Sequence, residues 1–340
     1  MLRPGLAQSR ALRPAFALAV PIVLLLLSVP LVGSTFVVKT LTEVLIFGIF
    51  AMSLDLLLGY TGLVSFGHAA FFGVGAYAAG YLAKELTPNI LIVLPLAVLL
   101  TAVAALLIGF LTVRLSGVYF LMLTLAFGQM MYALADRWTA VTGGSNGLAS
   151  IPRPQFSVGP ATLLIEDANA GYLLVLACFL LTVAILRGVV RSHFGHVLAG
   201  IRENEARLQS IGYDTMRFKL LVFMLAGMFA GVAGVLYAGY NRFVSTSDLY
   251  WTSSGQVLIM VVVGGAGTLV GPVLGAAMVL LLQNFVSSAT DRWPSIMGLI
   301  FILFVFGARR GLFGILFDLR ARVAAALGAS PASDQAGTGA

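Results

Sequence analysis

Long runs of apolar residues, each bounded by charged or turn-forming residues, follow one another along most of the chain. A bilayer's hydrocarbon layer of roughly 30 Å takes about 20 apolar helical residues to cross, so runs of this length predict membrane-spanning helices. They lie near 14–32, 38–58, 63–83, 89–112, 117–136, 170–188, 219–240, 255–267, 270–288 and 295–308. The pattern therefore predicts an all-α, polytopic integral membrane protein with about 10 transmembrane helices.

Composition agrees with this architecture. Of the 340 residues, 60% are hydrophobic and only 10% are charged, whereas a soluble domain carries about a quarter charged residues. The strands of a membrane barrel would alternate apolar and polar positions, but these runs are continuous. The first run follows Arg3, Arg10 and Arg13 and is open to two interpretations, a cleavable signal peptide or an uncleaved first helix. The many later spans favour the uncleaved helix.

Two polar stretches, 137–169 and 189–218, divide the chain, and the distribution of basic residues orients them. With the N-terminus inside, the inner segments collect fourteen Lys and Arg residues and the outer ones six, as the positive-inside rule requires. We therefore expect both termini in the cytoplasm. The expected organisation is a cytoplasmic N-terminal segment at 1–13, a transmembrane domain at 14–310 with an outer loop at 137–169 and a cytoplasmic loop at 189–218, and a cytoplasmic tail at 311–340 whose end is disordered.

Several functional classes lose support from what the sequence lacks. The net charge of +7 comes from Arg residues scattered between apolar spans, so a nucleic-acid patch is not indicated. No G-x-x-x-x-G-K-[ST] stretch occurs, so any drive from ATP must come from a partner. Cys178 is alone in the sequence, and His193 and His196 lack a third ligand, so no metal site and no catalytic set are predicted.

Glycine-rich stretches occur at comparable places in the two halves of the chain, one around 59–75 and one around 264–275. Transporter repeats use helices broken by glycine to expose backbone dipoles to a substrate, which suggests an internal pseudo-repeat. Close helix packing produces the same spacing of glycines, so both interpretations stay open. The glycines that could break or pack helices are Gly62, Gly67, Gly264, Gly265, Gly267 and Gly271.

Polar residues inside the spans are candidates for a substrate pathway or for hydrogen bonds between helices. Glu43 and Asp55 share the second span but lie about 120° apart around it, so they cannot line one narrow face. Snorkelling or helix packing suits them at least as well as a proton relay. The neutral candidates for a pathway are Ser65, His68, Thr124, Gln129 and Gln256.

The cytoplasmic loop contains a short amphipathic segment. Residues 199–210 predict a helix in which Glu203 and Arg207 form an i,i+4 pair and Gly212 suits the C-terminal cap. A helix this short is unstable alone in water. Beneath a membrane domain it could dock into a groove of a soluble partner, or it could be a solvated connector.

These residues together resemble the permease subunits of bacterial branched-chain amino-acid ABC importers over roughly 40–310. The Phe66-Gly67-His68 version is more similar to the amino-acid branch than to the urea branch of related permeases, while Leu208 and Gln209 replace the small residues common in the family. The stretches that carry the resemblance are GLVSFGHAAFFGVGAY at 62–77, GVYFLMLTLAFG at 117–128, TGGSNGL at 142–148, IRENE at 201–205 with Gly212, and GGAGTLVGPVLG at 264–275.

The resemblance implies a multi-pass permease of the bacterial inner membrane with no enzymatic activity and no cofactor of its own. It implies a second permease as heterodimer partner, two cytoplasmic ATPase subunits that hold ATP and Mg, and a periplasmic substrate-binding protein. The expected cargo is a branched-chain or related apolar amino acid; urea or short-chain amides, and a stand-alone channel or ion-coupled carrier, are the alternatives. The loop implied to contact the ATPase comprises Ile201, Arg202, Glu203, Asn204, Glu205, Arg207 and Gly212.

Overall fold

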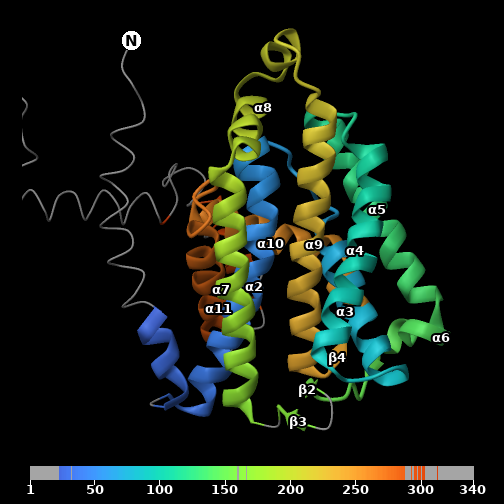
Figure 1. The fold of residues 1–340 in the computed structure, drawn as a ribbon, viewed down its shortest axis with the longest axis vertical. Helices are drawn as coiled ribbons and strands as arrows, with labels where there is room; N and C mark the ends of the chain where they lie inside the picture. The colour runs from blue at the N-terminus through green and yellow to red at the C-terminus, as the bar shows by residue number, and fades with distance from the viewer. Residues whose placement is uncertain are drawn as a thin grey trace, which may run out of the picture.

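The computed structural model describes residues 23–31, 33–158, 161–165 and 167–287, with isolated positions between 292 and 312. The predicted segments 1–13 and 311–340, and much of the spans at 14–32 and 295–308, lie outside the described residues. Within the described ranges the chain is a helical bundle (Figure 1). This confirms the predicted all-α membrane architecture, while the number of crossings stays a prediction.

The described helices match the apolar runs, with ends that shift by a few residues. Five of them, α2, α4, α5, α7 and α9, are long and apolar enough to cross a membrane. The α-helices are α2 (Thr35–Thr61), α3 (His68–Glu85), α4 (Ile90–Thr112), α5 (Gly117–Arg137), α6 (Thr139–Thr142), α7 (Ala168–Arg191), α8 (His193–Ser210), α9 (Thr215–Asn241), α10 (Trp251–Gly264) and α11 (Gly271–Ser287). Two 3₁₀ turns, η1 (Gly144–Asn146) and η2 (Thr246–Leu249), accompany them.

Short strands gather at one end of the bundle. Strand β2 (Gln155–Val158) pairs antiparallel with β3 (Ala161–Leu164), and β1 (Leu148–Ala149) pairs antiparallel with β4 (Phe243–Val244). Figure 1 shows this hairpin end at the bottom and α8 at the top. The predicted loops 137–169 and 189–218 therefore lie at opposite ends of the bundle, which we call the hairpin end and the α8 end.

Helix α9 forms the centre of the bundle and packs against α2, α3 and α4. Its glycines allow the close approach, because a Cβ atom added at Gly75 of α3 would come within 2.6 Å of the Cα of Gly231. Phe71 and Phe223 fill the space beside this contact, with ring centroids 5.4 Å apart and edge to face. Large apolar side chains on α4, α5 and α7 point outward instead, as expected of helices that face lipid.

The chain folds back into the bundle after α2. Gly62, with φ 74°, ends α2 in the left-handed conformation that glycine tolerates best. Helix α3 then begins at His68, whose Nε2 lies 2.9 Å from the Oγ of Ser53. Ser53 precedes the end of α2 by eight residues, or about 12 Å along the axis. Residues 62–67 therefore return to the interior, and α3 starts there as a shorter helix.

A second break after α9 repeats this arrangement in the opposite direction. Helix α9 runs toward the hairpin end, and residues 242–250 return from there to place Leu249 against Gly73. Helix α10 then starts inside the bundle, where Ser254 Oγ accepts a hydrogen bond from the N–H of Ala69 at 2.9 Å. Each 27-residue helix is thus followed by a break and a shorter helix, as in inverted repeats.

The two predicted glycine-rich stretches are therefore not equivalent halves of this repeat. Residues 62–67 form the first break, but the second break, 242–250, contains no glycine. The stretch at 264–271 instead forms the turn between α10 and α11 at the α8 end. There Gly264 lies directly against the backbone of Gly271, and Gly267 lies against Gly59. Similar glycine spacing arose from two different kinds of turn, because both bring backbones close together.

Candidate functional site

Helix α8 projects from the bundle between α7 and α9 and forms the α8 end of the molecule (Figure 1). It begins at His193, six residues before the predicted start. Asn204 breaks it, with φ −162° and ψ 94°, and its Oδ1 accepts the N–H of Arg207 at 3.0 Å. The side-chain amide thereby starts a new helical turn after the break. The predicted ion pair between Glu203 and Arg207 is absent from the described ion pairs, because the break separates the two turns.

Glu205 holds the part of α8 that follows the break at Asn204 against α9. Its carboxylate lies 2.7 Å from the Nζ of Lys219 and accepts the hydroxyl of Thr215 at 2.9 Å. The Lys219 side chain is only 6% exposed. The unusual Gln209 donates to the same Thr215 hydroxyl at 2.9 Å, and Leu208 packs against Gly200. The residues that depart from the family pattern therefore stabilise the fold of α8 itself.

Arg202 points from α8 back toward the transmembrane bundle. Its guanidinium donates a hydrogen bond to the carbonyl oxygen of Gly59 in the last turn of α2. It also attracts the carboxylate of Asp55, one turn earlier. Asp55 is fully buried, and its two oxygens accept the backbone N–H groups of Gly267 at 2.7 Å and Leu269 at 3.2 Å. We call Asp55, Gly59, Arg202, Gly267 and Leu269 the junction.

The junction connects three elements that are far apart in the sequence: α8, the end of α2, and the turn between α10 and α11. A buried carboxylate within a span is costly unless it is paired, and Asp55 is paired with two backbone donors and one nearby cation. From the sequence, snorkelling or helix packing suited Asp55 at least as well as a proton relay. An acidic residue in a mainly apolar span was the available signal, but the two backbone groups that donate to it lie more than two hundred residues away.

The remaining residues of the predicted ATPase-contact loop face solvent or the bundle. Ile201 is buried, whereas Glu203, Asn204 and Arg207 are exposed. Ile211 is a large apolar side chain that is 66% exposed, and Gly212 beside it has φ 92°. An exposed isoleucine among charged residues at the tip of a projecting helix is suited to a pocket in a partner.

Four of the five predicted pathway residues lie around the first break. Ser65 and His68 are fully buried, and Thr124 Oγ1 accepts the N–H of Phe66 at 3.3 Å. The His68 ring is bonded to Ser53 and stacks on Phe50 at 5.6 Å. Gln129 lies on α5, with a buried Nε2 that has no partner among the described residues. Around the break, His68 also contacts Phe71 of its own helix, and Thr124 Oγ1 also donates to the Leu121 carbonyl oxygen of its own helix at 2.9 Å.

Gln256, the fifth, lines a cavity of about 530 Å³ that we call the aromatic cavity. Its amide donates to Gln283 Oε1 at 2.9 Å. The walls come from α2, α3, α9, β4, η2, α10 and α11, and combine aromatic rings, amides and two carboxylates. The lining residues are Glu43, Phe47, Phe50, Phe72, Tyr237, Asn241, Phe243, Asp248, Ser253, Gln256, Leu280, Gln283 and Asn284.

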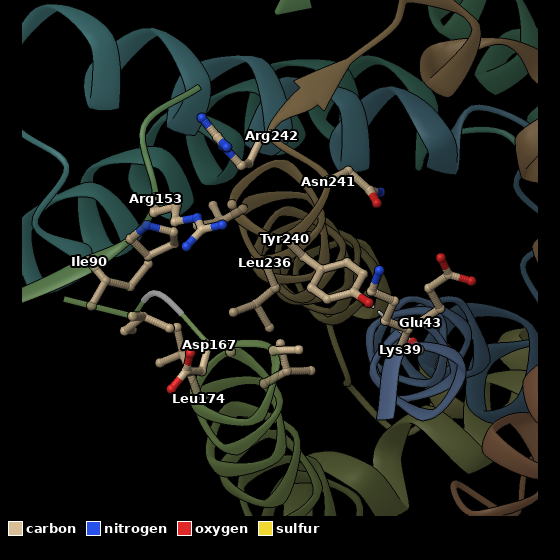
Figure 2. Close-up of a pocket in the computed structure, with 17 residues that line it drawn as sticks. Lys39, Glu43, Ile90, Arg153, Asp167, Leu174, Leu236, Tyr240, Asn241 and Arg242 are labelled. Carbon is tan, nitrogen blue, oxygen red and sulfur yellow. Dashed lines mark hydrogen bonds between the residues drawn. The ribbon is translucent and has the colours of Figure 1, made fainter. Parts of the chain in front are cut away.

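A second cavity of about 360 Å³ opens at the hairpin end between α2, α7 and α9. Lys39, Arg153 and Arg242 line it together with Asp167, and the Tyr240 hydroxyl donates to the Lys39 carbonyl oxygen at 3.4 Å (Figure 2). We call it the hairpin-end cavity. Its three basic residues are among the six Lys and Arg residues that the sequence placed in the outer segments. Their spacing in the sequence did not predict that they line one cavity.

Glu43 and Asn241 line both cavities. Figure 2 shows their side chains pointing to the same side, away from Arg153 and Asp167. The carboxylate of Glu43 has no hydrogen-bond or ion-pair partner among the described residues. No group of three or more metal-ligating side chains occurs in the described part of the chain.

Comparison with known proteins identifies the family of this chain. The sequence signature described as "Branched-chain amino acid transport system / permease component" matches residues 36–307. The chain belongs to this permease family. The match covers both breaks, the junction and α8, and confirms the family that the five sequence stretches resemble.

Curated relatives agree with the family. The high-affinity branched-chain amino acid transport system permease protein LivM of Salmonella typhimurium is 29% identical over 80% of this chain and 68% of its own length. LivM of Escherichia coli is 28% identical over 86% of this chain and 73% of its own length. The probable branched-chain amino acid transport permease protein LivM of Methanocaldococcus jannaschii is 22% identical over 69% of this chain and 76% of its own length. No solved structure matches the chain.

Proposed function

We propose that this chain is the permease subunit of an ATP-binding-cassette importer and forms, with a second permease, the membrane pathway for branched-chain or related apolar amino acids. Its partners are two cytoplasmic ATPase subunits, which hold ATP and Mg, and an extracytoplasmic binding protein. The α8 end then faces the cytoplasm and the hairpin end faces outward. The chain itself contributes no nucleotide chemistry.

The observation that carries this proposal is the junction beneath α8. A connector between two spans needs no contact with the bundle interior, whereas Arg202 reaches from α8 to the end of α2. A rigid element that touches both a partner and the ends of pathway helices can transmit motion between them. Ile211, exposed at the tip, suits insertion into the partner.

The distribution of basic residues supports the proposed orientation. Arg187, Arg191, Arg207 and Arg217 cluster around α8, and basic residues mark the cytoplasmic side of membrane proteins. The hairpin end, with two strand pairs and a cavity lined by charged residues, faces the side on which a binding protein delivers its cargo.

Reconstitution of the complete complex in lipid vesicles tests the proposal. Binding protein loaded with leucine is expected to raise the rate of ATP hydrolysis several-fold above the rate with empty binding protein, and leucine is expected to accumulate inside only with ATP. The ATPase subunits without the permeases provide the control. An unchanged hydrolysis rate, or uptake by this chain alone without ATP, contradicts the importer assignment.

A further inference from the structure

The aromatic cavity contains a complete set of groups for recognising a zwitterion with an apolar side chain. Two carboxylates, Glu43 and Asp248, face it from α2 and η2. Neither forms an ion pair with a basic side chain among the described residues. An ammonium group satisfies such carboxylates through charge-assisted hydrogen bonds.

Of the two carboxylates, Glu43 has the greater need for a partner. It is half-buried in a span that crosses the membrane, where an ionised side chain is costly unless it faces water or a partner. Its carboxylate has no described partner, and Glu43 lines the aromatic cavity as well as the hairpin-end cavity, so its hydrogen-bonding capacity is available to a ligand. Asp248 is anchored, because its two oxygens accept the N–H of Ser245 at 2.9 Å and the hydroxyl of Tyr237 at 3.5 Å.

Aromatic rings form the apolar wall between these carboxylates. The rings of Phe50 and Phe72 stack with centroids 4.7 Å apart, and Phe72 contacts Tyr237 at 5.2 Å. Phe47 completes the cluster, 6.1 Å from Phe72. Such a surface binds a branched aliphatic side chain by excluding water and also attracts a nearby cation through the ring faces.

Groups that can attract a carboxylate line the cavity on α10 and α11. Ser253 stands in the first turn of α10, whose N-terminal end carries a partial positive charge, and its hydroxyl already donates to the Ser247 carbonyl oxygen at 3.1 Å. Gln256 lies one turn further along α10, and its amide donates to Gln283 of α11 at 2.9 Å. Their remaining N–H groups can donate to an anion. The cavity volume of about 530 Å³ falls in the range of small-molecule sites.

We propose that the aromatic cavity is a transport site that binds an apolar amino acid as its zwitterion, with the ammonium between Glu43 and Asp248, the side chain on the Phe47, Phe72 and Tyr237 wall, and the carboxylate at the start of α10. The inference rests on the proposed permease function and narrows it. A neutral amide such as urea presents no cation to these carboxylates, so the site favours amino acids over amides.

Protection of a reporter thiol tests the site in the complete transporter. Asn284 is exposed and lines the cavity, so Asn284→Cys in a Cys178→Ala background places a thiol there. L-leucine at saturation is expected to slow labelling by a small methanethiosulfonate at least about fivefold. Asn146→Cys, exposed at the hairpin end and outside both cavities, is the matched control whose labelling rate leucine leaves unchanged.

Two analogues and two variants separate the groups of the ligand. 4-Methylpentanoate lacks the ammonium and isovaleramide lacks both charges, so each is expected to change the labelling rate less than twofold. Glu43→Gln and Asp248→Asn are each expected to reduce protection by leucine to less than twofold. Because Asp248 also caps η2, Glu43→Gln decides the matter if Asp248→Asn fails to assemble.

The labelling and ATP-hydrolysis results distinguish failure of the proposed site from failure of the proposed permease function. Protection by leucine that survives Glu43→Gln, or equal protection by isovaleramide, overturns the zwitterion site. Unprotected labelling in the presence of leucine overturns it as well. If loaded binding protein still stimulates ATP hydrolysis by the wild-type complex in that case, the permease role stands and only this site is lost. Absence of stimulation contradicts the proposed function instead.

Discussion

The guanidinium of Arg202 donates a hydrogen bond to the carbonyl oxygen of Gly59, joining α8 to the last turn of α2. The same last turns of α2 hold the turn between α10 and α11 through Asp55. If α8 moves relative to the bundle, either the hydrogen bond between Arg202 and Gly59 lengthens or the end of α2 moves with α8. Arg202 thus acts between α8 and the transmembrane helices, while its neighbours Glu203 and Arg207 face outward.

Arg202→Ala is expected to reduce ATP-driven uptake at least about tenfold while leaving ATP hydrolysis measurable, because the contact between α8 and α2 is lost. Arg202→Lys retains a cation but replaces the planar guanidinium with a single donor nitrogen, and it should recover part of the uptake. Uptake and hydrolysis measured on the same vesicles give the ratio that reports coupling. Equal ratios for Arg202→Ala and wild type would show that the junction transmits nothing.

Asp55→Asn is expected to destabilise the protein by about 1–3 kcal/mol, because the new amide places one N–H₂ group against a backbone N–H that has lost its acceptor. Thermal melting in detergent should fall by about 2 °C or more. Asp167→Asn, at an exposed position before α7, is the matched control with no shift. A melting temperature like that of wild type would mean that Asp55 contributes little to the turn at Gly267.

Glu205→Ala leaves Lys219 buried without its carboxylate, and we expect a loss of about 3 kcal/mol. The comparison is Arg217→Ala, which breaks the pair with Asp214 at the surface, where the side chains are 83% and 51% exposed, and keeps Asp214 as the N-cap of α9. An exposed pair is worth less than about 1 kcal/mol. Thermal melting of the two variants should therefore differ clearly, and similar losses would contradict the assigned burial of Lys219.

Gly75→Val should prevent assembly of the bundle, because an added Cβ at this position would overlap the backbone of Gly231. Backbone atoms at a helix crossing cannot move aside as a flexible side chain can. Gly171→Ala has open space around it and should be tolerated or slightly stabilising within α7. Yield of monodisperse protein after detergent extraction measures both. Normal yield of Gly75→Val would refute the close crossing of α3 and α9.

Cysteines at the two ends test the proposed orientation. In a Cys178→Ala background, Ser145→Cys at the hairpin end is expected to react with a membrane-impermeant thiol reagent in intact cells. Ser210→Cys at the end of α8 should react only after the membrane is opened. Both positions are exposed, so the difference reports sidedness and not burial. The reverse pattern would place α8 outside and remove the basis for contact with an ATPase.

The sequence alone determined the architecture and the family. The length and continuity of apolar runs such as 89–112 are local properties, and lipid allows only self-satisfied helices at such lengths. The helix α4 accordingly begins and ends within one residue of its prediction. The family stretches likewise included the segment around Asn204, although they did not predict the break at Asn204 itself.

Only the tertiary structure decided which polar groups meet. Asp55 and Gly267 are more than two hundred residues apart, and Glu43 shares a cavity with Asp248 because 242–250 folds back into the bundle. Nothing in the sequence of residues 242–250 indicates that the chain folds back there, since they contain neither glycine nor a long apolar run. The cost of burying polar groups in lipid favours packing in which they find partners, but the identity of each partner depends on how distant helices pack.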